Sequence, residues 1–319
     1  MRSRLSTSVF AEAAGPSLTE RLEKRLAIEK HFLELGCTYR HGRLHRFFER
    51  NVTRPMLKAG LQILGLYEKG KRNALSPVVR TVPVAFPDLP AAFDGFQILH
   101  LSDFHIDGTE GLPEALAESI RPLRPDVCVF TGDYRFEDRG PSEGVYPRMK
   151  TIIESIHAPE GIFAILGNHD PGEAVFEMGN MGVRMLVNDA AELRRRNHSL
   201  WILGLDDNFD FQTHDLDAAL SSVPHDEFKI LLAHAPEAYD EAAASGIRLY
   251  LCGHTHGGQI RLPRLGALKQ NARCPRPYAY GLWTHNGMHG YTSAGVGCSS
   301  LPIRFNCPPE LVLLELRAG

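Results

Sequence analysis

The sequence lacks the features of a secreted or membrane-spanning protein. Its six cysteines form no CxxC pair and no zinc-finger spacing, and Cys128 and Cys252 lie in apolar runs where small buried residues are expected. The N-terminus has no apolar run long enough for a signal peptide, and the stretch from Pro55 to Tyr67 is too short to span a bilayer. From these absences we predict a cytoplasmic protein with reduced cysteines.

Charge is present in both signs but is unevenly distributed. The net charge is -3, yet residues 21–72 hold 13 Lys and Arg against 5 Asp and Glu. Leucines recur at helical spacing in residues 17–35 and again in residues 40–69, where Pro55 predicts a break or a kink. We therefore expect a basic helical arm at the start of the chain.

The pattern of apolar and polar residues changes after this arm. Residues 73–90 contain four prolines, which predicts an extended connector with room for one edge strand. From residue 96, short apolar runs such as FQILHLSD, DVCVFTGD and GIFAILGNHD alternate with helical segments. Such runs are typical of strands buried on both faces, and the intervening helices predict βαβ units. The predicted parts are a basic helical extension (1–72), a proline-rich connector (73–90) and an α/β domain (91–319).

Nearly every predicted strand of this domain is followed by residues that can bind a metal ion. They are Asp103 with His105, Asp133, Asn168 with His169, His234, and His254 with His256. Because the carboxyl ends of parallel strands meet at one edge of a sheet, we expect these side chains to gather there. The two i, i+2 pairs would project to the same side if their backbone is extended.

Each of these segments has an ordinary structural interpretation when it is considered alone. Gly-Asp is a common turn, Gly-Asn-His-Asp can be a turn followed by a helix N-cap, and His234 can be a buried core histidine. Five such segments in order, each after a predicted buried strand, favour a shared metal site over five unrelated turns.

The five blocks resemble the calcineurin-like metallophosphoesterase superfamily. They are Asp-x-His (103, 105), Gly-Asp (132, 133), Gly-Asn-His-Asp (167–170), His234 and Gly-His-x-His (253–256). The forms GDY and GHTHGGQ are similar to a branch that includes YkuE-like and YaeI-like phosphodiesterases and UDP-2,3-diacylglucosamine pyrophosphatases. The resemblance covers about residues 96–260 and implies a four-layer α/β/β/α sandwich with a dinuclear metal centre.

The resemblance also implies a role for each matching residue. Asp103, His105 and His256 would hold one metal ion; Asn168, His234 and His254 would hold the second; and Asp133 would bridge the two. A hydroxide between the metals would attack the phosphorus. His169 would protonate the leaving group with Asp170 as its orienter, although Asp170 could instead be an N-cap near Pro171.

Two further expectations concern the metals and the second block. The mixed nitrogen and oxygen donors favour Mn²⁺, with Fe, Zn²⁺ and Mg²⁺ as alternatives. The second block departs from the common superfamily form, because Tyr134 and Arg135 follow Gly-Asp in place of a further Asp or Asn. The support around Asp133 is therefore left open.

The class of substrate that we predict depends on the role of the basic arm. If residues 40–72 lie on an anionic bilayer, the enzyme would act at the inner membrane face on a lipid-linked pyrophosphate or phosphodiester such as UDP-2,3-diacylglucosamine. The helix could instead pack on the domain with its arginines solvated or paired. A second possibility for the function is a soluble phosphodiesterase or phosphatase for nucleotides or small esters, with the arm serving as a dimerisation element. A non-catalytic scaffold with this fold is a third, which the complete ligand set disfavours. A nucleic acid is disfavoured because the arm lacks an aromatic stacking platform.

Overall fold

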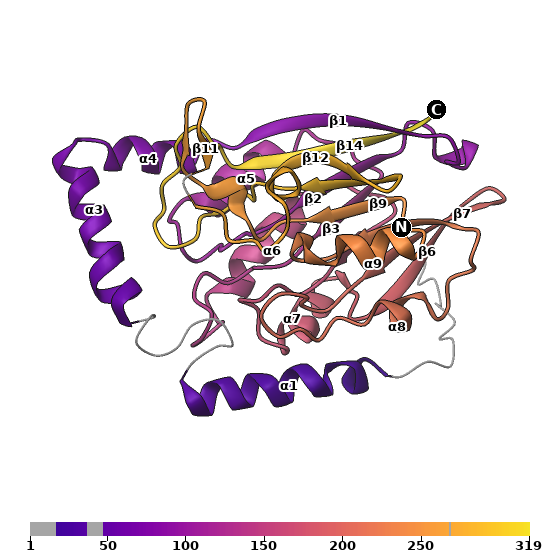
Figure 1. Cartoon of the computed structure of the whole chain (residues 1–319), viewed down its shortest axis with the longest axis horizontal. Coiled ribbons are helices and arrows are strands. Elements are labelled where there is room, and N and C mark those ends of the chain that lie inside the picture. The colour runs from indigo at the N-terminus through magenta and orange to yellow at the C-terminus, as the bar shows by residue number, and fades with distance from the viewer. Residues whose placement is uncertain (1–16, 37–46, 268) are drawn as a thin grey trace, which may run out of the picture.

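The computed structural model describes residues 17–36, 47–267 and 269–319, and two six-stranded sheets form its centre (Figure 1). The first sheet has the order β1 (Val78–Phe86), β14 (Glu310–Ala318), β2 (Gln97–Leu101), β3 (Val127–Phe130), β4 (Ile162–Ala164) and β5 (Arg184–Met185). Strands β2 to β5 are mutually parallel, whereas β14 is antiparallel to β2. Edge strand β1 lies within residues 73–90 and pairs with β14 in parallel.

The second sheet faces the first. Its order is β12 (Gly281–His285), β13 (Met288–Thr292), β9 (Leu249–Cys252), β8 (Phe228–Leu232), β7 (His198–Gly204) and β6 (Asp189–Arg195). Strands β13, β9, β8 and β7 are parallel, and β12 and β6 are antiparallel edge strands. A separate hairpin consists of β10 (Arg261–Leu262) and β11 (Gly266–Ala267).

Helices cover the outer faces of both sheets. Those on the first sheet are α5 (Leu112–Ile120), α6 (Val145–Ser155) and α7 (Ala174–Asn180), and those on the second are α8 (Leu216–Leu220) and α9 (Tyr239–Ala244). Short 3-10 turns lie at Ala91–Phe93, Pro236–Ala238, His256–Gly258 and Arg276–Ala279.

Side chains alternate between layers along each buried strand. In β2, Ile98 packs between the two sheets whereas Leu99 packs under the helices of the first sheet. In β8, Ile230 faces the space between the sheets and Leu231 faces α8 and α9. A strand with apolar contacts on both faces needs a continuous apolar sequence, which is why the runs do not alternate with polar residues. The predicted four-layer α/β/β/α sandwich is confirmed.

The N-terminal extension has two parts with different surroundings. Helix α1 (Leu18–Leu35) begins with a capping box between Ser17 and Glu20, lies lengthwise along the domain, and buries Leu22 and Phe32 (Figure 1). Helix α1, which precedes residues 40–72, therefore packs on the domain. Predicted helical residues 40–46 lie outside the described part of the chain.

The second part stands at the side of the domain. It comprises the π-helical turn η1 (Glu49–Thr53), α3 (Arg54–Ile63) and α4 (Tyr67–Ala74). Pro55 has no N–H group to donate to the carbonyl of Asn51. The Arg54 amide donates a hydrogen bond to the Glu49 carbonyl, five residues earlier, and this bond makes the wider turn at the predicted kink. Every residue of α3 is at least partly exposed. Across the described residues, the helices are too short or too polar to cross a bilayer.

The cysteines that the structure describes are free thiols, and Cys128 and Cys252 are buried as predicted.

Candidate metal centre

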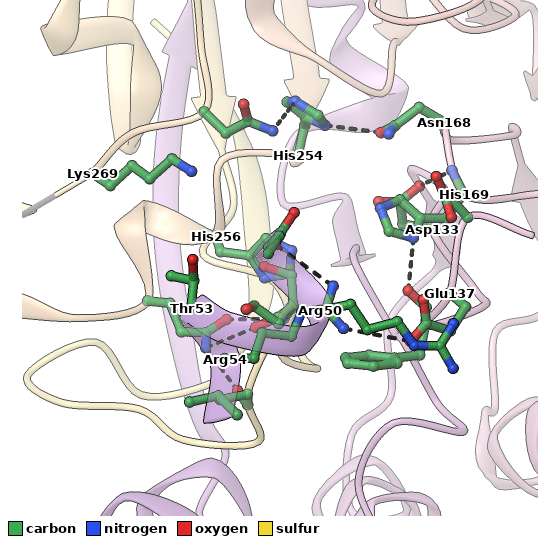
Figure 2. A pocket seen from close by; sticks show the side chains of 18 of the residues that line it. Arg50, Thr53, Arg54, Asp133, Glu137, Asn168, His169, His254, His256 and Lys269 are labelled. Carbon is green, nitrogen blue, oxygen red and sulfur yellow. Dashed lines mark hydrogen bonds and ion pairs between the residues drawn. The ribbon is translucent and has the colours of Figure 1, made fainter. Parts of the chain in front are cut away.

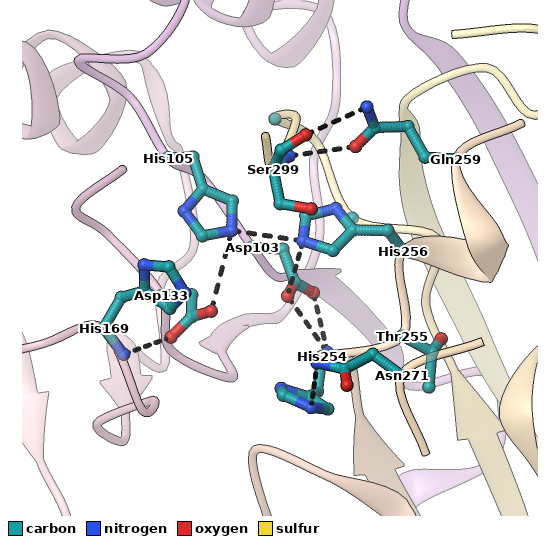
Figure 3. A network of polar contacts seen from close by, with 12 residues as sticks. Asp103, His105, Asp133, His169, His254, Thr255, His256, Gln259, Asn271 and Ser299 are labelled. Carbon is teal, nitrogen blue, oxygen red and sulfur yellow. Dashed lines mark hydrogen bonds and ion pairs between the residues drawn. The ribbon is translucent and has the colours of Figure 1, made fainter. Parts of the chain in front are cut away.

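The predicted ligands gather where strands of the two sheets end near one another. Strands β2, β3 and β4 bring Asp103 with His105, Asp133 and Asn168 from the first sheet, while β8 and β9 bring His234, His254 and His256 from the second. Three overlapping groups have donor atoms within 4.8 Å of one another: Asp103, His105 and His256; His105, Asp133 and His169; and Asp133, His234 and His254. Figure 3 shows several of these side chains converging.

The backbone that carries these side chains is not extended, contrary to the expectation for the i, i+2 pairs. Both members of each pair have positive φ, 52° at Asp103 and 39° at His105, and 66° at His254 and 52° at His256. Asp133 has φ of 59°. Left-handed backbone is costly for residues with a Cβ and persists at functional sites where the surrounding fold enforces it. The side chains converge because of these tight loops, not because of strand geometry.

Two glycines allow the loops to approach closely. A Cβ at Gly167 would collide with the carboxylate of Asp133, and one at Gly253 would collide with Ser102 and the carboxylate of Asp103. Glycine is therefore required at both positions by the space that the aspartates occupy.

Main-chain carbonyls fix the orientation of two histidine rings. His105 Nδ1 lies 2.8 Å from the carbonyl oxygen of Arg135, and His234 Nδ1 lies 2.7 Å from that of Thr131. A carbonyl can only accept, so both Nδ1 atoms carry a proton and both Nε2 atoms face the centre, where each can bind a metal ion once it is deprotonated. A ring nitrogen that donates to a main-chain carbonyl while the other faces inward is typical of histidine ligands to metals.

The inward-facing donor atoms are crowded. His105 Nε2 and His256 Nε2 lie 3.1 Å apart, and Asn168 Oδ1 lies 2.9 Å from His234 Nε2 and 3.0 Å from His254 Nδ1. The carboxylate of Asp133 is 3.6 Å from His105 Nε2 and 3.4 Å from His234 Nε2, between the two clusters. Lone pairs packed this closely fit cations held among them, and the nitrogen and oxygen donors suit divalent transition metals.

The pKa values of the buried acids and histidines differ strongly from their ordinary values. Burial, with a contribution from the Asp133 charge, raises the pKa of Asp103 to about 6, and burial lowers the pKa of His105 to about 3. Although burial acts in the opposite direction, the carboxylates of Asp133 and Asp103 raise the pKa of His234 to about 10. Because these groups are removed from solvent, the charges of the carboxylates must be balanced by nearby positive charge. Bound cations would supply that charge and reduce the repulsion between the carboxylates.

Asp133 receives support that its own motif does not contain. Its Oδ1 atom accepts from the His169 amide at 2.9 Å. The Asp170 carboxylate accepts from the amides of Asp133 at 2.8 Å, Tyr134 at 2.7 Å and Gly167 at 2.8 Å. The second and third blocks are thus joined through Asp170, which answers the question left open by Tyr134 and Arg135.

The His169 ring has a different partner. Its Nδ1 atom lies 2.7 Å from the carbonyl oxygen of Phe136, while the Asp170 carboxylate is engaged with main-chain amides. The orienting role of Asp170 stays a prediction. Its alternative as an N-cap is wrong, because α7 begins at Ala174 with Glu173 at the capping position.

Sequence reasoning missed residues that lie against the predicted set. Asp210 Oδ2 accepts from the Asn168 amide nitrogen at 3.1 Å, and Asn271 lies 3.1 Å from His254 Nε2. The fully buried Arg25 of α1 reaches the Gly167 carbonyl. Of these residues, only the Asp210 segment could have been found from the sequence, because the predicted strand LWILGLDD just before it also ends in acidic residues.

A cavity of about 840 Å³ opens onto the centre (Figure 2). Its lining includes Asp133, Asn168, His169, His254 and His256 from the centre and Thr53 and Arg54 from η1 and α3, and Figure 2 labels all of them. The lining also includes the apolar side chains of Phe47, Phe48, Leu57, Ile260, Leu301 and Ile303, and charged ones such as Arg50, Glu137 and Lys269.

The fold and this centre define the class of protein. A family model described as calcineurin-like phosphoesterase matches residues 96–258, and the chain belongs to that family. It is a metal-dependent phosphoesterase whose overlapping His/Asp groups are consistent with a dinuclear metal site. The alternative of a non-catalytic scaffold is set aside.

Two curated relatives are similar over most of the chain. The uncharacterized metallophosphoesterase YkuE of Bacillus subtilis is 32% identical over 238 residues, 72% of this chain and 82% of YkuE. The phosphodiesterase YaeI of Escherichia coli is 30% identical over 234 residues, 69% of this chain and 82% of YaeI. The solved structure of the calcineurin-like phosphoesterase YfkN from Bacillus subtilis aligns with a TM-score of 0.39 and 14% identity, over 63% of this chain and 81% of that chain.

Proposed function

We propose that the enzyme hydrolyses a phosphodiester or pyrophosphate bond in a lipid-linked substrate, of which UDP-2,3-diacylglucosamine is the model. The observation that supports this is the cavity, whose lining combines the His/Asp residues of the centre with apolar side chains such as Leu57, Ile260 and Leu301. A phosphoester with an attached acyl chain has this combination of charge and apolar length, and apolar lining favours its burial.

Each side chain of the centre has a proposed task. Asp103, His105 and His256 would hold one divalent ion, Asn168, His234 and His254 would hold the other, and Asp133 would serve both. Two such ions, with Mn²⁺ preferred, would supply positive charge to the phosphoryl oxygens and activate water. The chain contributes the rest by fixing the donor atoms before the substrate arrives.

His169 is the proposed general acid. Burial acts against its charged form, but the carboxylates of Asp133, Asp138 and Asp170 raise its pKa above the ordinary value. With Nδ1 held by the Phe136 carbonyl, a proton on Nε2 is available for the leaving oxygen. The raised pKa favours the protonated ring over the neutral one.

The exposed face of α3 is the proposed membrane contact. Met56, Ile63 and Leu64 are 68%, 86% and 70% exposed, and the basic side chains of Lys58 and Lys69 lie nearby in the sequence. An amphipathic basic helix lies on anionic bilayers with its apolar side chains in the lipid. Because α3 also lines the cavity through Leu57, this contact would bring a lipid-linked substrate to the centre.

A comparison of three substrates tests the proposal. The metal-reconstituted protein would be assayed with UDP-2,3-diacylglucosamine, bis-p-nitrophenyl phosphate and p-nitrophenyl phosphate at equal concentration. We expect the lipid pyrophosphate to have the highest kcat/KM and the monoester the lowest. A preference for bis-p-nitrophenyl phosphate would favour the alternative of a soluble phosphodiesterase for small esters, and a preference for the monoester would contradict both.

A further inference from the structure

Arg25 of α1 is fully buried although it belongs to the basic N-terminal extension. Its Nη2 atom donates to two carbonyl oxygens, that of Gly167 at 2.7 Å and that of Asp170 at 2.6 Å. These are the first and last residues of the Gly-Asn-His-Asp loop, so the guanidinium holds both ends of the four residues that carry Asn168 and His169.

The other partners of Arg25 belong to the segment after β7. Nη1 pairs with Asp206 Oδ1 at 2.5 Å, and the guanidinium plane lies 4.1 Å from the centre of the Phe211 ring. A planar guanidinium with several fixed donors can serve a carboxylate, two carbonyls and a ring face together, whereas an ammonium cannot. The set of partners around residue 25 therefore requires the geometry of an arginine side chain as well as its charge.

The segment that Arg25 holds also contacts Asn168 directly. Asp207 accepts from the amides of Asp210 at 2.7 Å and Phe211 at 2.6 Å, which shapes the turn. Asp210 then accepts from the Asn168 amide nitrogen at 3.1 Å. With its nitrogen held there, Asn168 presents Oδ1 to His234 and His254.

We propose that Arg25 is a positioning residue for the second metal position, resting on the function proposed above. It fixes the loop of Asn168 on one side and the turn of Asp210 on the other, so the amide oxygen of Asn168 stays among the histidine donors. The N-terminal helix, which lies outside residues 96–258 of the family match, thereby completes the metal centre.

Three variants of the full chain test this role. Arg25→Ala removes every contact, Arg25→Lys keeps the charge but not the planar fork, and Arg21→Ala is the control. Arg21 lies on the same helix and pairs with Asp189 at 3.0 Å on the partly exposed side. Metal content after Mn²⁺ reconstitution, the visible spectrum with Co²⁺, kcat and KM would be measured for each, together with the melting temperature.

We expect Arg25→Ala to retain one tightly bound metal and to bind the second about 10- to 100-fold more weakly, as outer-shell substitutions at metal sites do. At subsaturating metal its kcat should fall with KM nearly unchanged, and excess Mn²⁺ should recover part of it. Arg25→Lys should give a smaller loss and melt close to wild type, so it decides the matter if Arg25→Ala does not fold. Arg21→Ala should bind both metals like wild type.

Normal binding of both metals by folded Arg25→Ala or Arg25→Lys would overturn the proposal, as would an equal loss in Arg21→Ala. The metal count and the Co²⁺ spectrum do not depend on turnover. If the wild type binds two metals but hydrolyses none of the three esters, the proposed function fails while the role of Arg25 is still decided by binding.

Discussion

His169 and Asp133 lie side by side in the centre but differ in what they contact. Asp133 lies between the two clusters of donor atoms, whereas His169 extends from the next loop with its ring held by Phe136. We expect His169→Ala to retain both metals and to lose about 10²- to 10⁴-fold in kcat, the usual contribution of a general acid. Asp133→Ala should lose metal occupancy, because it removes the carboxylate that lies between the two clusters. Metal analysis and kcat of the same samples measure both effects.

The control for this pair is His225→Ala, since the His225 side chain is fully exposed. It should match wild type in metal content and turnover. Equal metal content and equal activity in His169→Ala and Asp133→Ala would refute the division of roles.

At the scale of elements, α1 and α3 are adjacent in sequence but differ in their surroundings. Helix α1 buries Leu22, Arg25 and Phe32 against the domain, whereas α3 exposes Met56 and Ile63. Deleting the whole extension would therefore disturb the metal centre together with any membrane contact. Substitutions on the exposed face of α3 separate the two.

The double variant Met56→Glu, Ile63→Glu should lose binding to anionic vesicles. Burying each of these side chains in lipid contributes about 1.5–3 kcal/mol, so binding should weaken by at least about tenfold. Co-sedimentation with phosphatidylglycerol-containing vesicles at two salt concentrations measures this. Phe176→Glu is the control, because Phe176 is also exposed, at 50%, but lies on α7. Unchanged sedimentation of the double variant, or an equal loss in Phe176→Glu, would remove the membrane contact from the proposal.

At the scale of the whole molecule, buried neutral histidines make stability depend on pH. Burial lowers the pKa of His100, in the middle of the first sheet, to about 3, and its Nε2 atom lies 2.8 Å from Thr131 Oγ1. The unfolded chain takes up a proton near the ordinary pKa of about 6.5, but the folded chain does not until about pH 3. The contribution of His100 to stability is therefore complete above pH 6.5 and is lost as the pH falls.

We expect the unfolding free energy of wild type to fall faster than that of His100→Gln between pH 6 and 4, with a difference of at most about 1.4 kcal/mol per pH unit. Glutamine does not titrate and can still bond Thr131. Urea unfolding with a chelator present measures the slopes without a contribution from metal uptake. His225→Gln, at an exposed site, should follow wild type, and parallel slopes for wild type and His100→Gln would contradict the prediction.

Much of the centre could be predicted because its signals are local. Each predicted ligand follows a strand that is apolar on both faces, so the strand and the polar residue that ends it can be found within a dozen residues. Asp103 and His254 were found in this way, but their left-handed backbone was not, because no short-range pattern marks a conformation that the surrounding loops impose. Asp170 was found as well, yet its bonds to the loop of Asp133 depend on a partner 37 residues away.

The sequence by itself determined the chemistry of this protein: the donor types, their order along the chain, and the apolar strands that carry them. Tertiary structure alone decided which sheet supplies each donor, which histidine nitrogen faces inward, and that Arg25 reaches a loop 142 residues away. The reason is physical. Residue identity and strand burial depend on neighbours in the sequence, whereas a guanidinium 2.7 Å from a distant carbonyl exists only after α1 and the two sheets have packed together.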